Sequence, residues 1–383
     1  MYSIRAYGAM IADRVRTDAY EQALRQAVRP GAVVLDIGTG TGIFALMACR
    51  FGARHVYAIE PNPAIEVARM CAAANGYADR ITYIEGLSTA VDLPEKADVI
   101  VSDVRGTLPL NGGLSAVIDA RDRLLAQGGV LIPQRDNLWL AVVEAKELYR
   151  SVSGPWEDHP YSVDLRPARP LVINTRSFGT VKPDQLLAEP QLWATLDYCT
   201  IQQISVTGKA TSRIARNGTG HGLSLWFDSH LLDGIGYSTG PTAEAPATIY
   251  GNVFLPWIRP VELAENDQVS VTVRADLVGD EYVWSWTTRV VAADGPGETK
   301  AAFDQSTFFG VPLSAKRRRT LAADNKPVRN DEAEIDAFIL VQMDGRSSSG
   351  DIAERVLGRF PGRFRDWATA LTRVGWLSER YSR

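Results

Sequence analysis

The sequence predicts an α/β fold: a doubly wound parallel sheet, followed by a largely antiparallel β domain and a small helical module. Short runs rich in Val and Ile alternate with helical stretches over residues 1–137, which is the rhythm of βαβ units. Strand-like runs separated by turns follow over residues 138–315. Amphipathic stretches close the chain over residues 325–383. We therefore expect three domains.

The expected strands of the parallel sheet are the apolar runs VVLDI, HVYAIE, ITYIEG, ADVIVSDV and GGVLIP. Helices are expected between them, for example over FALMACRFG and PAIEVARMCAAANG. The second domain should contain the strands LWLAVVEA, ISVTGKA, GLSLWFDSHLLDG, NVFLPW, QVSVTVRADL and YVWSWTTRVV. Their pattern is typical of an antiparallel sandwich or barrel.

Polar and charged segments, KRRRT and DNKPVRND, separate the β domain from the end of the chain, as linkers do. The stretches AEIDAFILVQMDG, SSGDIAERVLGRF and FRDWATALTRVGWL then predict three short helices. They should form one small module.

Composition excludes several classes of protein. The chain has 383 residues and a formal net charge of -4, so no global basic field invites nucleic acid. Cys49, Cys71 and Cys199 form no CxxC pair and the four histidines are scattered, which argues against a disulfide framework or a metal site. No apolar run reaches the length of a membrane span, and the N-terminus lacks a signal-peptide core. We expect a cytoplasmic protein without metal.

The strongest motif is VLDIGTGTGIFALMACRFGA. A buried strand runs into a turn with Gly38, Gly40 and Gly42, where the missing Cβ atoms let the backbone approach a ligand, and a helix follows. Asp36 lies directly before the turn, where a carboxylate would repel phosphate. The motif therefore suits a ligand with no phosphate and a cationic amino-acid end, such as S-adenosylmethionine.

Glu60 ends the next strand, in VYAIEPN. A carboxylate about twenty residues after such a turn can accept both ribose hydroxyls of a nucleoside. The alternative is a tight turn with no ligand and a surface charge at Glu60. The order of strand, DxGxGxG, helix and terminal Glu favours the cofactor interpretation.

At these residues the sequence resembles the protein arginine methyltransferases, and the likeness runs from residue 7 to about 310. YGAMIADRVRTDAY resembles the family's leading helix, with Met10, Asp13, Arg16 and Thr17 at its recurring positions. The resemblance implies that Arg16 grips the cofactor's carboxylate and that Met10 lies near the sulfonium. HGLSLWFDSHLLDGIGYSTGPTAEAP resembles the family's barrel, which implies a β-barrel for the second domain.

Motif and resemblance together give the expected cofactor-binding residues: Met10, Arg16, Asp36, Gly38, Thr39, Gly40, Gly42, Ile43, Glu60, Pro61, Leu87, Ser88 and Asp103. The family's adenine-binding Glu is missing near Ser88 and Thr89, so backbone contact should replace it there.

The acceptor side departs from the family, which clamps arginine between two glutamates. In VSDVRGTLPLNGGLS the first acidic position is kept as Asp103, while the second falls on Gly112 or Gly113. Arg105 appears inside the loop. The family's Thr-His-Trp turn reads Ala247, Thr248 and Ile249, so its His is absent.

A rebuilt acceptor site follows from these departures. The expected catalytic residues are Asp103, as general base toward an amine or hydroxyl, and Arg105, which binds an acceptor carboxylate or simply pairs with Asp103. We expect an S-adenosylmethionine-dependent methyltransferase with a peptide, natural-product or other small-molecule acceptor. A conventional arginine methyltransferase and a non-catalytic cofactor-binding scaffold are the alternatives.

Two segments suggest partners. FILVQMDGRSSSGDIAERVLGRFP resembles small winged-helix modules that bind leader peptides, with Ile352, Val356 and Leu357 facing inward; mere docking on the barrel is the alternative. WEDHPYSVDLRP lies where the family has a dimerisation arm, here about residues 147–174, with Trp156 and Tyr161 as anchors. By analogy with the family we expect a homodimer. The alternative is that this segment is an ordinary surface loop.

Overall fold

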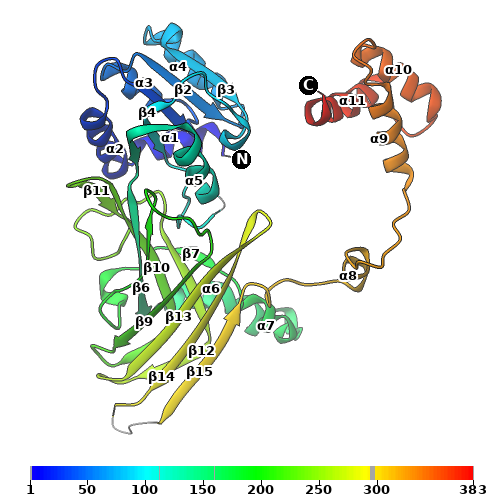
Figure 1. Cartoon of the computed structure of the whole chain (residues 1–383). Helices are drawn as coiled ribbons and strands as arrows, with labels where there is room; N and C mark the ends of the chain where they lie inside the picture. The colour runs from blue at the N-terminus through cyan, green and yellow to red at the C-terminus, as the bar shows by residue number, and fades with distance from the viewer. Residues whose placement is uncertain (1, 112, 159, 294–297, 383) are drawn as a thin grey trace. The chain divides into compact units, whose positions relative to one another are not determined.

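A computed structural model describes residues 2–111, 113–158, 160–293 and 298–382. The chain divides into two compact units, Met1–Pro312 and Leu313–Arg383 (Figure 1). Each unit is described by itself. No helix among the described residues has the length and apolar character that crossing a membrane requires.

The first unit begins with a parallel sheet in the order β3-β2-β1-β4-β5. Its strands are β1 (Val33–Ile37), β2 (His55–Glu60), β3 (Ile81–Glu85), β4 (Ala97–Ser102) and β5 (Leu125–Ile132). Its helices are α1 (Ile4–Ala12), α2 (Arg14–Ala27), α3 (Ile43–Arg50), α4 (Ile65–Ala74) and α5 (Gly113–Leu124), with short 3₁₀ turns η1 (Ala78–Arg80) and η2 (Ser88–Ala90). Every predicted strand is present, and the strand order reverses beside β1, where such sheets bind ligands.

Two antiparallel sheets then form the barrel-like domain, in the orders β7-β12-β10-β6-β8, with β11 paired to β10, and β15-β14-β13-β9. The strands are β6 (Arg135–Val143), β7 (Ser177–Gly179), β8 (Gln191–Asp197), β9 (Val206–Arg213), β10 (Gly218–Leu232), β11 (Ile235–Ser238), β12 (Asn252–Leu263), β13 (Gln268–Val278), β14 (Glu281–Val291) and β15 (Thr299–Ser306). The β-barrel prediction is confirmed in outline, and one continuous apolar core runs through both sheets and the parallel sheet.

Residues 147–174, the predicted dimerisation arm, are built mainly from α6 (Lys146–Glu157), the 3₁₀ turns η3 (Pro160–Ser162) and η4 (Arg166–Ala168), and α7 (Arg169–Val172). A further turn, η5 (Pro183–Gln185), precedes β8. Tyr149 and Ile173 fix the arm by packing against Phe254 of β12. Tyr161 is 97% exposed, so its role as a partner anchor stays a prediction.

The second unit contains α8 (Ala315–Thr320), α9 (Asp331–Gln342), α10 (Ser349–Arg359) and α11 (Trp367–Tyr381). The last three are the predicted helices, and they share an apolar core to which Ile352 and Val356 contribute, with Leu357 packed at its edge. Ser348 and Asp351 close α10 with a reciprocal capping box, as the Ser-rich segment suggests. Residues 313–382, all described, contain no strand, so the winged-helix expectation is corrected: the unit is helical and lacks a wing.

Candidate cofactor and acceptor site

A cleft of about 810 Å³ opens at the carboxyl ends of β1, β2 and β4, between α1 and the barrel residues Ile249 and Tyr250. This is the edge of a doubly wound sheet where ligands bind. The predicted residues that line the cleft are Met10, Arg16, Gly38, Thr39, Gly40, Ile43, Glu60, Pro61, Asp103 and Arg105. Most of the predicted cofactor and catalytic residues therefore meet in one place.

The glycine turn after β1 is shaped by close approach of other segments. Gly40 has a φ of 55°, and a Cβ built there would lie 2.5 Å from Cε1 of Tyr7 in α1. Gly38 has a φ of 72°, and its Cβ would lie 2.5 Å from the Val104 side chain. Only glycine allows both this backbone conformation and this contact. The turn is therefore pressed between the leading helix and the loop that follows β4.

Glu60 is held at the cleft wall by the backbone. Its Oε2 accepts a hydrogen bond from the Gly40 amide at 2.9 Å, and its Oε1 accepts one from the Asn62 amide at 2.9 Å. Burial raises the pKa of this carboxyl, and the two amides oppose that shift. Each carboxylate oxygen can accept a further hydrogen bond, and Glu60 lines the cleft, which suits the predicted pair of ribose hydroxyls.

Asp36 does not line the cleft, and its predicted contact with the cationic end of a ligand stays a prediction. Its side chain is buried, and Oδ2 accepts hydrogen bonds from Thr39 Oγ1 at 2.6 Å and from the Ala45 amide at 3.1 Å. Burial raises the pKa of Asp36 to about 7. Asp36 thus stabilises the glycine turn through Thr39 and links the turn to α3 through Ala45.

Three other predicted ligands also lie outside the cleft lining. Gly42 packs against Ala68 of α4. Leu87 is 61% exposed, and Ser88 is buried with its carbonyl accepting a hydrogen bond from Arg123 Nη2 at 2.9 Å. The backbone contact expected near Ser88 therefore stays a prediction.

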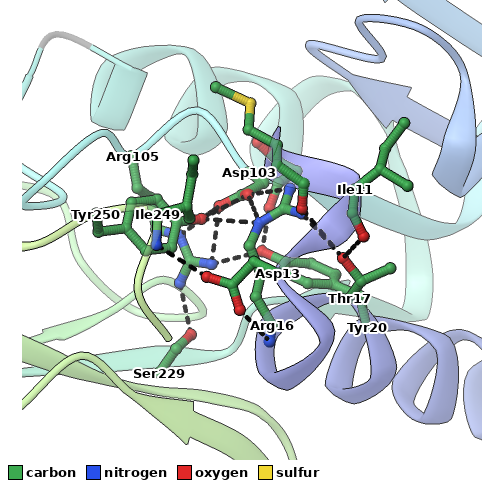
Figure 2. Close-up of polar contacts among 12 residues, drawn as sticks. Ile11, Asp13, Arg16, Thr17, Tyr20, Asp103, Arg105, Ser229, Ile249 and Tyr250 are labelled. Carbon is green, nitrogen blue, oxygen red and sulfur yellow. Dashed lines mark hydrogen bonds and ion pairs between the residues drawn. The ribbon is translucent and has the colours of Figure 1, made fainter. Parts of the chain in front are cut away.

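Arg16, in the first turn of α2, binds Asp103 directly (Figure 2). Its Nε also donates to the Tyr250 hydroxyl at 3.0 Å, and its Nη1 donates to the Met10 carbonyl at 3.2 Å. Tyr250 in turn donates to Asp103, at 2.7 Å to Oδ1 and 2.6 Å to Oδ2. Arg16 thus lines the cleft, as predicted, and its guanidinium already binds the Asp103 carboxylate.

Asp103 is a poor general base in this setting. Burial alone would raise the pKa of its carboxyl, but Arg16, Arg105 and the Tyr250 hydroxyl outweigh burial and hold it below the usual value. A base with a lowered pKa and several bound donors takes a proton reluctantly. The structure therefore favours a positioning role for Asp103 over the predicted proton transfer.

Arg105 is buried and pairs with Asp103, so its alternative role of binding an acceptor carboxylate is corrected. Its Nη1 also donates to Asp136 at 2.8 Å. Its remaining hydrogen bonds go to hydroxyl groups, those of Tyr20, Ser229 and Tyr237. With every guanidinium donor engaged, Arg105 has none left for a ligand.

The turn that lacks the family's His is anchored by the leading helix instead. Asp13 Oδ1 accepts from the Arg16 amide at 3.3 Å and caps α2, while its Oδ2 accepts from the amides of Thr248 at 2.8 Å and Ile249 at 2.9 Å. This places Tyr250 over Asp103. Gly112, one candidate for the second clamp position, lies outside the described residues, and Gly113 begins α5.

Two important residues were missed by the sequence reasoning, Tyr7 and Tyr250. Both are aromatic and lie next to segments that were singled out, the MIADRVRT helix and the altered turn. The sequence carried a signal for each residue. A bulky side chain near a glycine-rich turn, or in a loop at a cleft, commonly packs into the space there. Nothing in the chain pattern places Tyr250 against Asp103, 147 residues away.

Comparison with known proteins gives two family matches. Residues 17–133 match the family described as ribosomal protein L11 methyltransferase (PrmA), and residues 134–276 match the arginine methyltransferase oligomerization subdomain.

Individual relatives agree. The chain is 33% identical over 247 residues to protein arginine N-methyltransferase 1 of Oryza sativa subsp. indica, covering 62% of this chain and 63% of that protein. It is 28% identical over 375 residues to probable histone-arginine methyltransferase 1.3 of Arabidopsis thaliana, covering 92% and 69%. The chain thus spans less than two thirds of the length of the first of these relatives.

Solved structures show the same fold. The Trypanosoma brucei PRMT1 enzyme-prozyme heterotetrameric complex with AdoHcy matches with a TM-score of 0.72 and 23% identity, over 78% of this chain and 96% of that one. Arabidopsis thaliana protein arginine methyltransferase 10 matches with a TM-score of 0.69 and 24% identity, over 79% and 97%. The parallel sheet followed by a barrel-like domain is therefore the arrangement of arginine methyltransferases.

Proposed function

We propose that this chain is an S-adenosylmethionine-dependent methyltransferase, since residues 17–133 match the ribosomal protein L11 methyltransferase family and residues 134–276 match the arginine methyltransferase oligomerization subdomain. The observation that carries the proposal is the meeting of the glycine turn, Glu60 and Arg16 in one cleft. Glu60 suits the ribose hydroxyls and the glycine turn suits close backbone approach, while Arg16, whose fork already binds Asp103, would have to share or release that pairing to bind the carboxylate of the methionine part.

Methyl transfer depends mainly on the alignment of the acceptor with the methyl group of the cofactor. Glu60 and the glycine turn would hold the cofactor, and the proton that the acceptor loses would pass to bulk water, because Asp103 takes a proton reluctantly. S-adenosylmethionine supplies the methyl group, already activated by the positive sulfur. The chain's contribution is to hold the two reactants in line and to exclude water. Asp103, Tyr250 and Met10 line the same cleft and contact Arg16, and they would position the acceptor.

We propose further that the preferred acceptor is a peptide or natural-product group other than a free guanidinium. Asp103 and Asp136 carry two negative charges, and Arg16 and Arg105 carry two positive charges, so this buried set is already neutral. An entering guanidinium would find no net negative charge in this set, and a buried cation without a partner costs several kcal/mol. Conventional arginine methylation is the second candidate, and the similarity to arginine methyltransferases favours it.

A transfer assay with methyl-labelled cofactor decides between these acceptors. A glycine-arginine-rich peptide, the same peptide with every Arg replaced by Lys, and peptides with free carboxylates and hydroxyls are offered in parallel. We expect transfer to the arginine peptide to be about a hundredfold or more slower than to the best acceptor, which corresponds to about 3 kcal/mol. Brisk transfer to arginine would restore the second candidate, and cofactor binding without any transfer would indicate a scaffold.

Two exposed features of the chain suit partners. The arm of residues 147–174 exposes Tyr161, and residues 134–276 match an oligomerization subdomain, so we propose a homodimer. The helical second unit exposes Trp367 and Trp376 on α11, which suits a leader or partner peptide. Docking of this unit on the barrel remains the simpler alternative.

A further inference from the structure

The guanidinium of Arg105 is enclosed by rings as well as by hydrogen-bonding groups. Its Cζ lies 5.3 Å from the ring centre of Phe227, 5.5 Å from that of Tyr237 and 5.8 Å from that of Tyr20. Cations are attracted to ring faces at such distances. The enclosure, hereafter the Arg105 cage, consists of Tyr20, Asp103, Asp136, Phe227, Ser229 and Tyr237.

The walls of the Arg105 cage have contacts that do not involve Arg105. Tyr20 stacks on Phe44 with ring centres 4.4 Å apart, and its hydroxyl reaches the Ser102 carbonyl at 2.9 Å. Asp136 Oδ2 accepts from the Tyr198 hydroxyl at 2.6 Å. Since α2, β6, β10 and β11 contribute these walls, the cage is fixed by packing of the whole unit.

The Arg105 cage also adjoins the cleft. Asp103 and Arg105 both line the cleft, and Asp103 Oδ1 accepts from Arg105 Nε at 3.1 Å and Nη2 at 3.0 Å (Figure 2). A carboxylate, aromatic faces and hydroxyls around a planar cation are what a guanidinium-binding site requires. Here the chain's own side chain provides the cation.

We propose that the Arg105 cage is a guanidinium-binding site that the chain keeps filled with its own arginine, and that Arg105 thereby excludes a guanidinium-bearing acceptor from Asp103. The first half stands on the contacts alone, while the second half rests on the proposed methyltransferase function. An ordinary buried ion pair would stabilise the fold equally well, but its vacant place would show no selectivity for guanidinium.

Chemical rescue tests the first half. In Arg105→Ala, guanidinium at low millimolar concentration, far below denaturing levels, should raise the Tm by about 2–4 °C when it exceeds its Kd about tenfold. Sodium at equal ionic strength and urea, which is planar but neutral, should not raise it. The matched control is Arg121→Ala, which removes a partly buried arginine whose partners include the carbonyls of Tyr198 and Ile201.

A rise in Tm with urea or sodium, a rise of the same size in Arg121→Ala, or no rise in Arg105→Ala would overturn the guanidinium site. If Arg105→Ala does not fold in buffer, Arg105→Gln carries the same test, since the shorter side chain keeps a hydrogen-bonding group and leaves the place of the guanidinium vacant. If neither folds, recovery of folded protein on refolding with guanidinium, and not with sodium or urea, supports the site. Recovery with none of them overturns it.

The second half is tested by methyl transfer to the arginine-rich peptide. Arg105→Ala should methylate the arginine-rich peptide at least about tenfold faster than wild type, a gain of about 1.4 kcal/mol. Added guanidinium should compete with the peptide and return the rate to the wild-type value. A variant that shows guanidinium rescue and binds cofactor but gains no transfer to arginine overturns the exclusion alone. Failure of the wild type to bind cofactor would instead overturn the proposed function and leave the rescue result standing.

Discussion

Asp36 and Asp103 are both buried, yet their surroundings move their pKa values in opposite directions. Burial raises the pKa of Asp36 to about 7, because only Thr39 and one backbone amide oppose it. Burial acts on Asp103 as well, but Arg16 and Arg105 outweigh it and lower that pKa. The Asp36 carboxyl therefore stabilises the glycine turn. The Asp103 carboxyl is ionised and binds the side chains that surround it in the cleft.

Tyr250→Phe should show how much of that organisation depends on one hydroxyl. Losing the donor to Asp103 should cost about 1–3 kcal/mol of stability at pH 7, the usual value for a hydrogen bond to a charged group. A lowered carboxyl pKa contributes stability above the unfolded-state pKa near 3.8, and that stability is lost as pH falls through the folded-state value. The gap between wild type and variant should therefore narrow below about pH 4.

Denaturant unfolding at pH 7 and at several lower pH values measures this gap. Tyr83→Phe is the matched control, because the Tyr83 hydroxyl donates to the neutral Ala68 carbonyl at 3.0 Å and its loss should cost a pH-independent amount. Equal, pH-independent losses in both variants would mean that the Tyr250 hydroxyl does not act through the charge of Asp103.

Single residues were predicted well where a local pattern fixes them. Gly40, Glu60 and Arg16 line the cleft as expected, because the motif and the leading helix set their places in the chain. The pairing of Arg105 with Asp136 was not predicted, because it joins residues from the parallel sheet domain and the first barrel strand through tertiary packing. Sequence spacing carries no information on such a contact.

Among the elements, the contact between α1 and the glycine turn should control the cofactor cleft. Gly40→Ala would drive a Cβ into the Tyr7 ring, so either α1 or the turn must shift. We expect cofactor affinity to fall at least about tenfold, or about 1.4 kcal/mol. Calorimetry with S-adenosylhomocysteine measures it.

Gly76→Ala is the control for backbone strain. Gly76 also has a positive φ, 73°, but a Cβ there meets no atom within 4 Å. It should lose stability by about 1–2 kcal/mol and keep its cofactor affinity. Equal affinity in the two variants would show that Tyr7 does not press on the turn.

Helices and strands could be predicted where the spacing of the apolar residues and the residue composition indicate the same element. The strands of the parallel sheet and the long barrel strands were expected because buried runs of Val and Ile leave few alternatives. Four barrel strands were not expected: β7, β8, β11 and β15. They are short or polar, as in TKAAFDQS of β15, and pairing with a neighbouring strand determines them more than their own sequence does.

At the scale of the whole molecule, the first unit combines a cofactor cleft with a barrel-like domain that closes it. The turn holding Tyr250 reaches Asp103, and Asp13 fastens that turn to the leading helix. The second unit has an apolar core of its own, to which Ile335, Ile352 and Leu377 contribute. The two family matches, over residues 17–133 and 134–276, both lie in the first unit, whereas the wing was expected in the second from a short and separate resemblance.

The most direct test of this account is calorimetric titration of S-adenosylmethionine, or its demethylated product, into the full chain. We expect a micromolar Kd, on the order of −8 kcal/mol. Glu60→Ala should weaken binding by about 1–3 kcal/mol, since it removes an ionised acceptor for the ribose hydroxyls and frees the Gly40 amide. Absence of heat and of any thermal shift at millimolar cofactor would contradict the assignment of the cleft, whatever the acceptor.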